Sequence, residues 1–489
     1  MSRIGIHWFR RDLRIHGNPG LRWNYKQTKG NTLGVFCFDS KFLSRSDFSH
    51  NRFAVFMNAI NQLKINLKNI GMDLVVIDEL PNIAYPKILS FLKDKNITLE
   101  AFSYNRDYEP FALKRDNEIN TWLTNENISF QTFRDHLIIE PHELAKPDGT
   151  FYKVYTPFAK KWLEIFTQTE VKKRCSPKFS GINQAFSSQP VEKIFHPLLK
   201  SKLKNFPYQD YLQSFIDDNS KKVTIEIPTI TTESIYQNLK NFKSKISKYK
   251  VDRDYPNING TSKFSIPLKN GSLTTSQVIS YLKLKPVDYK SPTGEMTFLK
   301  EIIWREFYYH ILFHQPSVET TAFKEKYRNL KWCTSKKLFS AWCEGKTGFP
   351  IVDAGMRELN TTGWMHNRVR MIVASFLVKN LQINWQWGEK YFMEKLLDGD
   401  LAPNNGGWQW AASTGCDAQP YFRIFNPWTQ SKKFDSNGEY IKKYIPELAT
   451  LDNKQIHEPH LFPGKLNYPK PIIDYKKSRE ETMERFKIL

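Results

Sequence analysis

Paired cysteines and long apolar runs are missing from this sequence. The five cysteines among its 489 residues are scattered and odd in number, with no C-x-x-C pair, so neither a disulfide framework nor a zinc site is expected. No apolar run approaches the length of a membrane-spanning helix. Arg10 and Arg11 resemble a twin-arginine export signal, but polar residues follow them where such a signal is apolar. We therefore expect a cytoplasmic protein with no metal and no membrane partner.

Two common nucleotide-binding motifs are also missing. No expected strand is followed by G-x-G-x-x-G, and G-x-x-x-x-G-K-[ST] does not occur. Both motifs bring glycine backbone against phosphate groups. A dinucleotide or nucleoside-triphosphate site of the usual kind is therefore not supported.

What the sequence has in excess is positive charge. Its 72 Lys and Arg residues outnumber 50 Asp and Glu, which gives a net charge of +22 and a pI near 9.5. Such a surplus favours nucleic acid, less often an anionic membrane, although a lysine-rich solvated surface without a partner stays open. Thirteen tryptophans, most of them after residue 300, set the second half apart. A chain of this length is expected to form two or more domains.

The first 135 residues alternate between strand and helix patterns. Short apolar runs predict buried strands, and apolar residues at helical spacing predict the helices between them. The expected strands are 4–9, 31–39, 72–78 and 97–104, and the expected helices are 52–70 and 111–123. This order predicts a doubly wound parallel sheet of the Rossmann-like α/β type.

The rest of the chain has a different pattern. Periodicity is lost from about 140 to 205, and 172–189 is rich in Lys, Ser, Pro and Gln, which indicates a long linker. Helical patterns follow, among them 298–314 and 366–381. We therefore expect an α/β plus all-α fold, divided into an α/β domain at 1–135, a linker at 136–205 and a helical domain at 206–480.

Two helical segments carry side chains suited to holding a base. Glu301 and Trp304 are three residues apart, so a carboxylate and an indole share a helix face and could bind a base by its edge and its plane. Asn367 and Met371 are four apart, and an amide with a thioether can line a pocket for a polar heterocycle. Taken singly, each pair is explained better by ordinary packing.

Two further segments suit a cofactor. Residues 396–415 combine carboxylates, amides, glycines and two tryptophans, which is typical of a cofactor cradle. Asp398 and Asp400 could also be the carboxylate pair of a glycoside hydrolase, but that function does not account for the basic net charge. The run GTSKFS at 260–265 offers hydroxyls, a cation and backbone N–H groups to a phosphate, or alternatively caps a helix.

These four segments resemble the photolyase–cryptochrome family in their order, their spacing and the identity of their residues. The match extends to HWFRRDLR near the start, to 344–368 and to 421–435, and it is densest from 298 to 448. The sequence is most similar to the class I branch, which repairs cyclobutane pyrimidine dimers. The resemblance implies an N-terminal α/β domain, a linker and a C-terminal helical domain that holds FAD.

The resemblance also implies which residues contact FAD. The family usually has Arg where Lys263 stands. Lys keeps the positive charge but cannot donate two parallel hydrogen bonds to a phosphate as a guanidinium does. Arg370 and Asp398 match an ion pair over the flavin ring, and Asn404 matches the group beside flavin N5. The implied FAD contacts are Tyr249, Thr261, Ser262, Lys263, Phe264, Ser265, Phe298, Arg370, Asp398, Gly399, Asp400 and Asn404.

Three positions separate the branches of this family. Plant cryptochromes carry Asp where Asn404 stands, and a neutral amide favours the fully reduced anion FADH− that repair requires. Asn367 and Met371 match the dimer-repairing enzymes, whereas (6-4) photolyases carry a His pair in this helix and DASH-type relatives usually carry Gln where Met371 stands. The resemblance therefore implies a light-driven lyase that splits pyrimidine dimers. A cryptochrome-type photoreceptor, a protein that only binds damaged DNA and a DNA-binding protein without flavin are the alternatives.

The resemblance assigns the remaining roles. A dimer flipped out of UV-damaged DNA, or held in a single strand, would receive one electron from excited FADH− and return it after splitting. Glu301 and Asn404 are implied as catalytic residues, and Trp332, Trp385 and Trp408 as an electron relay. The implied lesion and DNA contacts are Arg253, Glu301, Trp304, Arg305, Asn367, Arg368, Met371, Trp410, Arg423 and Gln430. An antenna chromophore is expected to contact Glu109, with 5,10-methenyltetrahydrofolate as the first choice and a deazaflavin as the second. The protein is expected to be a monomer.

Overall fold

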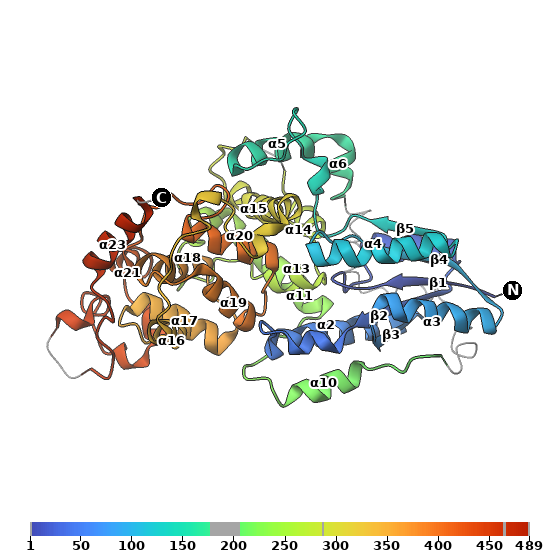
Figure 1. Cartoon of the computed structure of the whole chain (residues 1–489), viewed down its shortest axis with the longest axis horizontal. Helices are drawn as coiled ribbons and strands as arrows, with labels where there is room; N and C mark the ends of the chain where they lie inside the picture. The colour runs from blue at the N-terminus through green and yellow to red at the C-terminus, as the bar shows by residue number, and fades with distance from the viewer. Residues whose placement is uncertain (1, 177–205, 286–287, 463–465, 488–489) are drawn as a thin grey trace. The chain divides into compact units, whose positions relative to one another are not determined.

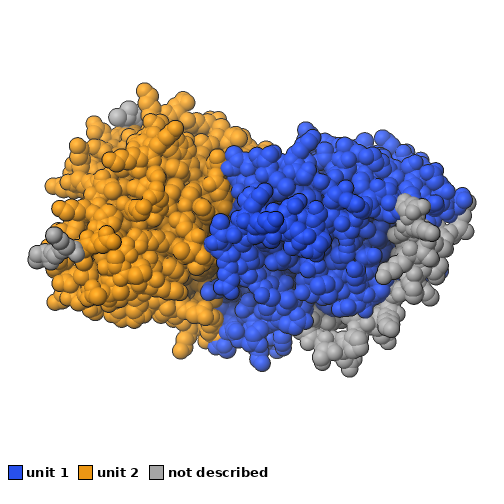
Figure 2. Space-filling model, turned by 90° about the horizontal axis from the view of Figure 1, so that it is seen from below, with its two compact units in different colours: residues 1–145, 160–244, 262–289 blue, residues 146–159, 245–261, 290–489 orange. Residues whose placement is uncertain are grey.

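The chain forms two compact units, which are coloured separately in Figure 2. The computed structural model describes residues 2–176, 206–285, 288–462 and 466–487. Unit 1 comprises residues 1–145, 160–244 and 262–289, and unit 2 comprises 146–159, 245–261 and 290–489. Each unit is therefore assembled from segments that are separated along the sequence.

A five-stranded parallel sheet forms the centre of unit 1 (Figure 1). Its order is β3-β2-β1-β4-β5, so the chain builds outward from β1 to one edge and then returns to build the other. The order thus reverses between β1 and β4, where ligands of such sheets commonly bind. The strands are β1 (Ser2–Trp8), β2 (Thr32–Phe38), β3 (Asp73–Asp78), β4 (Ile97–Asn105) and β5 (Phe130–Phe133).

Helices cover both faces of the sheet. Ile4, Ile6 and Trp8 alternate along β1 and share one hydrophobic cluster with α3 and α4, whereas α1, α2 and α10 contribute to a second cluster on the other face. A Cβ on Gly5 would lie 2.0 Å from Asn24 Oδ1, so only glycine permits α1 to approach β1 this closely. The helices are α1 (Pro19–Gln27), α2 (His50–Asn69), α3 (Pro81–Asp94), α4 (Pro110–Asn125) and α10 (Leu212–Ser220).

These elements confirm the doubly wound parallel sheet. All four expected strands and both expected helices are present, with ends that differ by at most two residues. Within the expected linker, where the sequence shows no clear periodicity, the structure contains two helices, α5 (Tyr155–Thr167) and α6 (Thr169–Lys173). Phe158, Trp162 and Phe166 are four residues apart and buried, a signal of α5 that the flanking Lys and Ser residues obscured. Most of the expected linker, 177–205, lies outside the described residues.

Unit 2 is helical. Its main cluster of buried residues runs from Trp342 to Ile456. Helix α15 begins at Gly294, where a Cβ would lie 1.9 Å from the Ile246 carbonyl oxygen, so the helix start approaches the backbone of 246–247 directly. The helices are α12 (Tyr249–Asp252), α15 (Gly294–His314), α16 (Lys336–Cys343), α17 (Pro350–Thr362), α18 (Asn367–Ser375), α19 (Trp385–Lys395), α20 (Leu401–Ala412), α21 (Pro427–Phe434), α22 (Glu439–Tyr444) and α23 (Tyr475–Lys487).

The helix expected at 366–381 is present but changes its winding. His366 caps the start of α18, and a π-helical turn, Phe376–Asn380, follows its last residue. The turn carries Lys379, whose buried ammonium donates to Ser413 Oγ at 2.8 Å. Burial lowers the pKa of Lys379 to about 7. The wider turn therefore brings a polar side chain to the end of α20, which apolar periodicity does not reveal.

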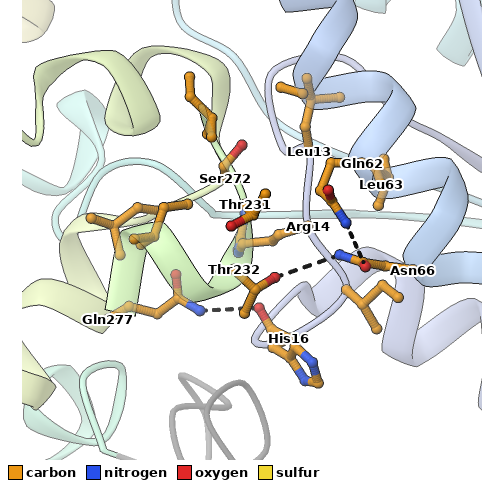
Figure 3. Close-up of a pocket in the computed structure, with 15 residues that line it drawn as sticks. Leu13, Arg14, His16, Gln62, Leu63, Asn66, Thr231, Thr232, Ser272 and Gln277 are labelled. Atoms are coloured by element: carbon orange, nitrogen blue, oxygen red, sulfur yellow. Dashed lines mark hydrogen bonds between the residues drawn. The ribbon is translucent and has the colours of Figure 1, made fainter. Parts of the chain in front are cut away.

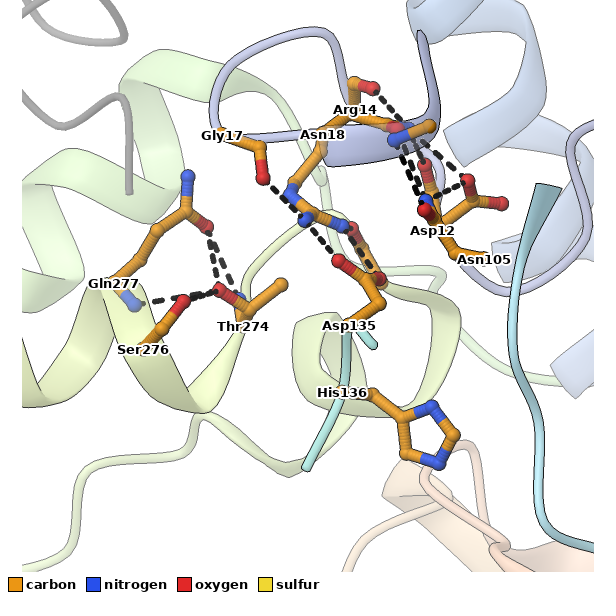
Figure 4. Close-up of polar contacts among 12 residues, drawn as sticks. Asp12, Arg14, Gly17, Asn18, Asn105, Asp135, His136, Thr274, Ser276 and Gln277 are labelled. Atoms are coloured by element: carbon orange, nitrogen blue, oxygen red, sulfur yellow. Dashed lines mark hydrogen bonds and ion pairs between the residues drawn. The ribbon is translucent and has the colours of Figure 1, made fainter. Parts of the chain in front are cut away.

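A buried polar network lies beyond the carboxyl end of β1 (Figure 4). Asp12 Oδ2 accepts from Asn105 Nδ2 at 2.7 Å and from Asn18 Nδ2 at 3.0 Å, and it lies 3.2 Å from His7 Nε2. Burial alone would raise the pKa of Asp12, but the His7 contact and the Arg14 charge lower it to about 2. The segment HWFRRDLR thus supplies polar groups that join β1 to α1 and β4.

Unit 1 also encloses a small cavity, shown in Figure 3. Its walls come from residues 13–16, from α2, and from residues near 231 and 273. Gln277 Nε2 donates to the His16 carbonyl at 3.2 Å, and Asn66 Nδ2 donates to Thr232 Oγ1 at 3.5 Å. A volume of about 40 Å³ holds a few water molecules, which is too little for a pterin or a flavin.

Candidate active site

Helix α15 carries the first part of the candidate site in unit 2. Glu301 and Trp304 lie on one face of the helix, as their spacing predicts. Arg253, just after α12, forms an ion pair with the Glu301 carboxylate. Burial raises the pKa of Glu301, and the Arg253 charge opposes that rise. The carboxyl group is therefore held by a cation in a partly buried position.

A chain of alternating charges joins α15 to α18. Arg253 contacts Glu301 on one side and lies 4.0 Å from Asp254 on the other. Arg368 Nη2 in turn donates to Asp254 Oδ1 at 2.6 Å, and its guanidinium lies over the Phe434 ring. The two candidate phosphate-binding arginines are thus positioned by carboxylates of the same unit.

The amide and thioether of α18 lie next to each other. Asn367 Nδ2 is 3.9 Å from Met371 Sδ, so the two candidate lesion contacts form one polarizable surface. Asn367 is exposed and Met371 is partly buried. This arrangement agrees with a shared face at the i, i+4 spacing.

Carboxylates and amides gather at the start of α20. Arg370 Nη2 donates to Asp398 Oδ2 at 2.9 Å, which places the expected ion pair in the structure. Asp400 accepts from the Tyr309 hydroxyl at 2.7 Å. Asn404 Nδ2 donates to the Glu389 carbonyl at 3.0 Å, which fixes the plane of its amide.

Three features of this region fit a bound flavin. Asp398 Oδ1 and Trp408 Nε1 are buried, and neither has a hydrogen-bond partner among the described residues. A Cβ on Gly407, which lies one turn after Asn404 on α20, would meet nothing within 4 Å. Buried donors and acceptors without partners suit a polar heterocycle.

Sequence reasoning missed several residues of this region. His366 is buried, its Nε2 has no partner among the described residues, and burial together with the Arg370 charge lowers its pKa to about 4. Tyr309 and Asp254 hold Asp400 and Arg368. These residues act through the neighbours that they orient, and single-sequence patterns carry no signal for such contacts.

The candidate phosphate segment is divided between the units. Tyr249 and Thr261 belong to unit 2, whereas residues 262–265 belong to unit 1. Phe298 and Tyr249 meet edge to face with ring centroids 5.3 Å apart. Phe264 occupies the cap position of the short helix α13 (Ser265–Asn270) without a side-chain cap bond, so helix capping by Ser or Thr does not explain the run GTSKFS.

The candidate relay tryptophans belong to one hydrophobic core. Trp408 and Trp385 are buried within the main cluster of unit 2, and Trp332 is partly buried against it. A Cβ on Gly388 would lie 2.1 Å from the Trp408 ring, so α19 and α20 approach closely at this point. The structure therefore brings the three indoles into one contiguous core.

The other expected site residues are found in both units. Arg305 Nη2 is 3.9 Å from Asp400 Oδ2, and Arg423 is exposed. Glu109, in unit 1, is paired with Arg11 Nη1 at 3.0 Å and with Lys269 Nζ at 3.5 Å. Trp410 and Gln430 are partly buried, and Gly399, between Asp398 and Asp400, is buried.

Metal ligands and membrane helices are not evident in the described part of the chain. Residues 2–176, 206–285, 288–462 and 466–487 contain no group of three or more His, Cys, Asp or Glu able to hold a metal ion. Within the same ranges, every helix is too short or too polar to cross a membrane.

Comparison with known proteins identifies the family. A sequence profile of the FAD binding domain of DNA photolyase matches residues 298–488, and a DNA photolyase profile matches residues 5–178. Enzymes named deoxyribodipyrimidine photo-lyase from Escherichia coli and Alkalihalophilus pseudofirmus are each 36% identical. Both alignments cover 98% of this chain and 97% of the relative.

Solved structures agree with the sequence matches. A bacterial class III photolyase from Agrobacterium tumefaciens superposes with a TM-score of 0.81 at 31% identity, over 100% of this chain and 98% of that one. A Sulfolobus tokodaii photolyase with two FAD molecules gives 0.75 at 29%, covering 99% and 100%. A Synechocystis cryptochrome shares the fold, with 0.81 at 24% and 99% of each chain. The chain therefore belongs to the DNA photolyase family.

Proposed function

We propose that this chain is a deoxyribodipyrimidine photo-lyase, which uses light and reduced FAD to split cyclobutane pyrimidine dimers in DNA. The observation that carries this proposal is similarity over nearly the full length to enzymes of that name. The residues of unit 2 support it, because they include a carboxylate paired with an arginine, an indole on the same helix, and two amides that could hydrogen-bond a base or a flavin.

The cofactor would bind at the start of α20. Asp398 and Arg370 would face the flavin ring, with Asp398 Oδ1 free to accept a hydrogen bond. The neutral amide of Asn404 would lie beside the ring, where it can donate or accept a hydrogen bond but cannot release a proton. When bound and excited by light, reduced FAD supplies one electron to the cyclobutane ring and recovers it after the ring splits.

The protein would position the lesion and keep water out. Glu301 would exchange its Arg253 partner for a polar edge of the dimer. Trp304 and Trp410 would lie against the rings, and Asn367 with Met371 would complete the wall. A dimer pairs and stacks poorly, so flipping it out of the duplex costs less than flipping an intact base.

The DNA backbone would lie along basic residues of unit 2. Arg253, Arg368 and Arg423 are the candidate phosphate contacts, with Arg305 and Gln430 beside the lesion. The net charge of +22 supports a nucleic-acid partner. The protein would act as a monomer in the cytoplasm.

Light harvesting and cofactor reduction would use other residues. Trp408, Trp385 and Trp332 would pass an electron inward when the flavin is oxidised. An antenna, 5,10-methenyltetrahydrofolate or a deazaflavin, would contact Glu109, which would then rearrange its pairs with Arg11 and Lys269.

One assay tests the proposal directly. Purified protein is mixed with a thymine-dimer oligonucleotide, and restored thymine is measured with and without near-UV or blue light. Restoration only in the light is expected. Equal turnover in darkness would exclude the mechanism, and light-induced flavin absorbance changes without repair would indicate a photoreceptor.

A further inference from the structure

Residues 151–155, which we call the strap, form a bridge within unit 2. At one end the strap contacts α15. Phe151 stacks on His314, with ring centroids 4.9 Å apart and planes 7° apart. The backbone N–H of Tyr152 donates to His310 Nε2 at 3.2 Å. The carboxyl-terminal half of α15 thus holds the beginning of the strap.

The other end of the strap contacts the loop that follows α20. Tyr155 N donates to Asp417 Oδ2 at 3.0 Å, and the Lys153 carbonyl accepts from Cys416 Sγ at 2.6 Å. The Tyr155 hydroxyl donates to the Lys300 carbonyl at 3.0 Å, which fixes the ring against α15. Tyr155 is only 4% exposed, so its ring has a single defined position.

That ring covers one face of Trp304. The centroids of the two rings are 3.5 Å apart and their planes are 5° apart. The other ring contacts of Trp304 among the described residues are an edge contact with Phe307 and a tilted contact with Tyr308. No second described ring therefore lies parallel to the opposite face of the indole, which remains partly exposed.

We propose that Tyr155 is a positioning residue that holds the Trp304 indole with one face covered and the other face turned to the lesion. This inference rests on the proposed function, in which Trp304 stacks on the flipped dimer. An indole that is already immobilised loses little conformational entropy on binding. Because the indole plane of Trp304 is fixed, a lesion can stack only on the face that Tyr155 leaves uncovered.

The size of the effect follows from the entropy of one side chain. Ordering one aromatic side chain on binding weakens affinity about 3- to 10-fold. Tyr155→Ala should therefore weaken binding of a dimer-containing oligonucleotide by about this factor. Binding of undamaged DNA should not change, because it depends on contacts with the phosphate backbone.

Binding of both oligonucleotides is measured for the wild type, Tyr155→Phe, Tyr155→Ala, Trp304→Ala and the double variant. Tyr155→Phe keeps the stacked ring and should retain the preference for damaged DNA. If Tyr155 acts through Trp304, Tyr155→Ala should add nothing in the Trp304→Ala background. FAD content, read from the flavin absorbance, should stay the same in all variants.

Phe151→Ala is the matched control, because it removes an aromatic ring from the same strap without touching Trp304. An equal loss of preference in Phe151→Ala, or additive losses in the double variant, would overturn the positioning role. Unchanged preference in Tyr155→Ala would also overturn it. A wild-type protein without any preference for damaged DNA would instead refute the proposed function.

Discussion

At the scale of single residues, the ion pair of Glu301 with Arg253 would, under the proposed function, link the binding of a lesion to the binding of a phosphate. The carboxylate is partly buried, and its only described ion-pair partner is the Arg253 guanidinium. A lesion that displaces Arg253 from the carboxylate frees the guanidinium for a nearby phosphate. Lesion binding and backbone binding would therefore be coupled through two side chains.

Replacing Glu301 should weaken repair more than binding. Glu301→Ala would remove a hydrogen bond that is stronger, by about 1 kcal/mol, to the dimer radical anion than to the neutral dimer, so repair per absorbed photon should fall by up to roughly fivefold while binding changes less. Glu301→Gln keeps a polar atom in place and should lose less. Thymine restored by pre-reduced enzyme at saturating substrate gives the comparison, and an unchanged yield in Glu301→Ala would contradict the assigned role.

Asp12 should make unit 1 sensitive to acid. Its pKa is about 2 in the folded state, below the usual value of a carboxyl group, so the ionised form contributes stability above about pH 4. That contribution is lost as the pH falls from about 4 to 2. Asp12→Asn should lose it at neutral pH, at a cost of ~2 kcal/mol in the free energy of unfolding. Denaturant unfolding at pH 7 and pH 3 tests this, since the difference between variant and wild type should shrink at the lower pH.

At the scale of helices and strands, α19 carries Trp385 and approaches α20 closely where Gly388 meets the Trp408 ring. Trp385→Phe keeps most of the buried ring and therefore the packing of α19. It should nearly abolish photoreduction of oxidised flavin while leaving repair by chemically reduced enzyme intact. Flavin absorbance under illumination and thymine restoration are measured on the same preparation, and parallel losses would indicate damage to the fold.

Elements with strong periodicity could be predicted from the sequence, and those shaped by tertiary contacts could not. Four of the five strands contain apolar runs and α15 has a long helical pattern, so the sequence predicts them. The short strand β5 (Phe130–Phe133), half of whose residues are polar, was not predicted. The π-helical turn after α18 depends on contacts of Lys379 with Ser413 and Thr482, which are distant in sequence. The same holds for the stack of Tyr155 on Trp304, because nothing local to either residue points to the other.

The candidate site divides in the same way. Resemblance to a family supplied Arg370, Asp398 and Asn404, whereas their residue types alone left several explanations open. The groups that hold such residues, for example the Glu389 carbonyl at Asn404 and the Tyr309 hydroxyl at Asp400, came only from the structure. Motifs that contain charged residues can be recognised in a single sequence. The residues that orient those charged groups cannot, because they are distant along the chain.

At the scale of the whole molecule, the positive charge predicts DNA binding that weakens with salt. Arg423 is exposed, and no described carboxylate lies within ion-pair distance of it, unlike Arg253 and Arg368. Arg423→Ala should reduce the slope of log affinity against log salt by about 0.9, equally for damaged and undamaged DNA. Titrations between low and physiological salt measure the slope. An effect confined to damaged DNA would instead place Arg423 at the lesion.

The segmented make-up of unit 2 has a practical consequence for anyone who wishes to produce it separately. A gene fragment starting at residue 206 would encode the helices but omit 146–159, including the tyrosine that covers one side of Trp304. Such a fragment would expose apolar surface that the intact polypeptide conceals. Supplying the missing peptide in trans, or splicing it to the fragment by circular permutation, would be needed to recover a complete pocket.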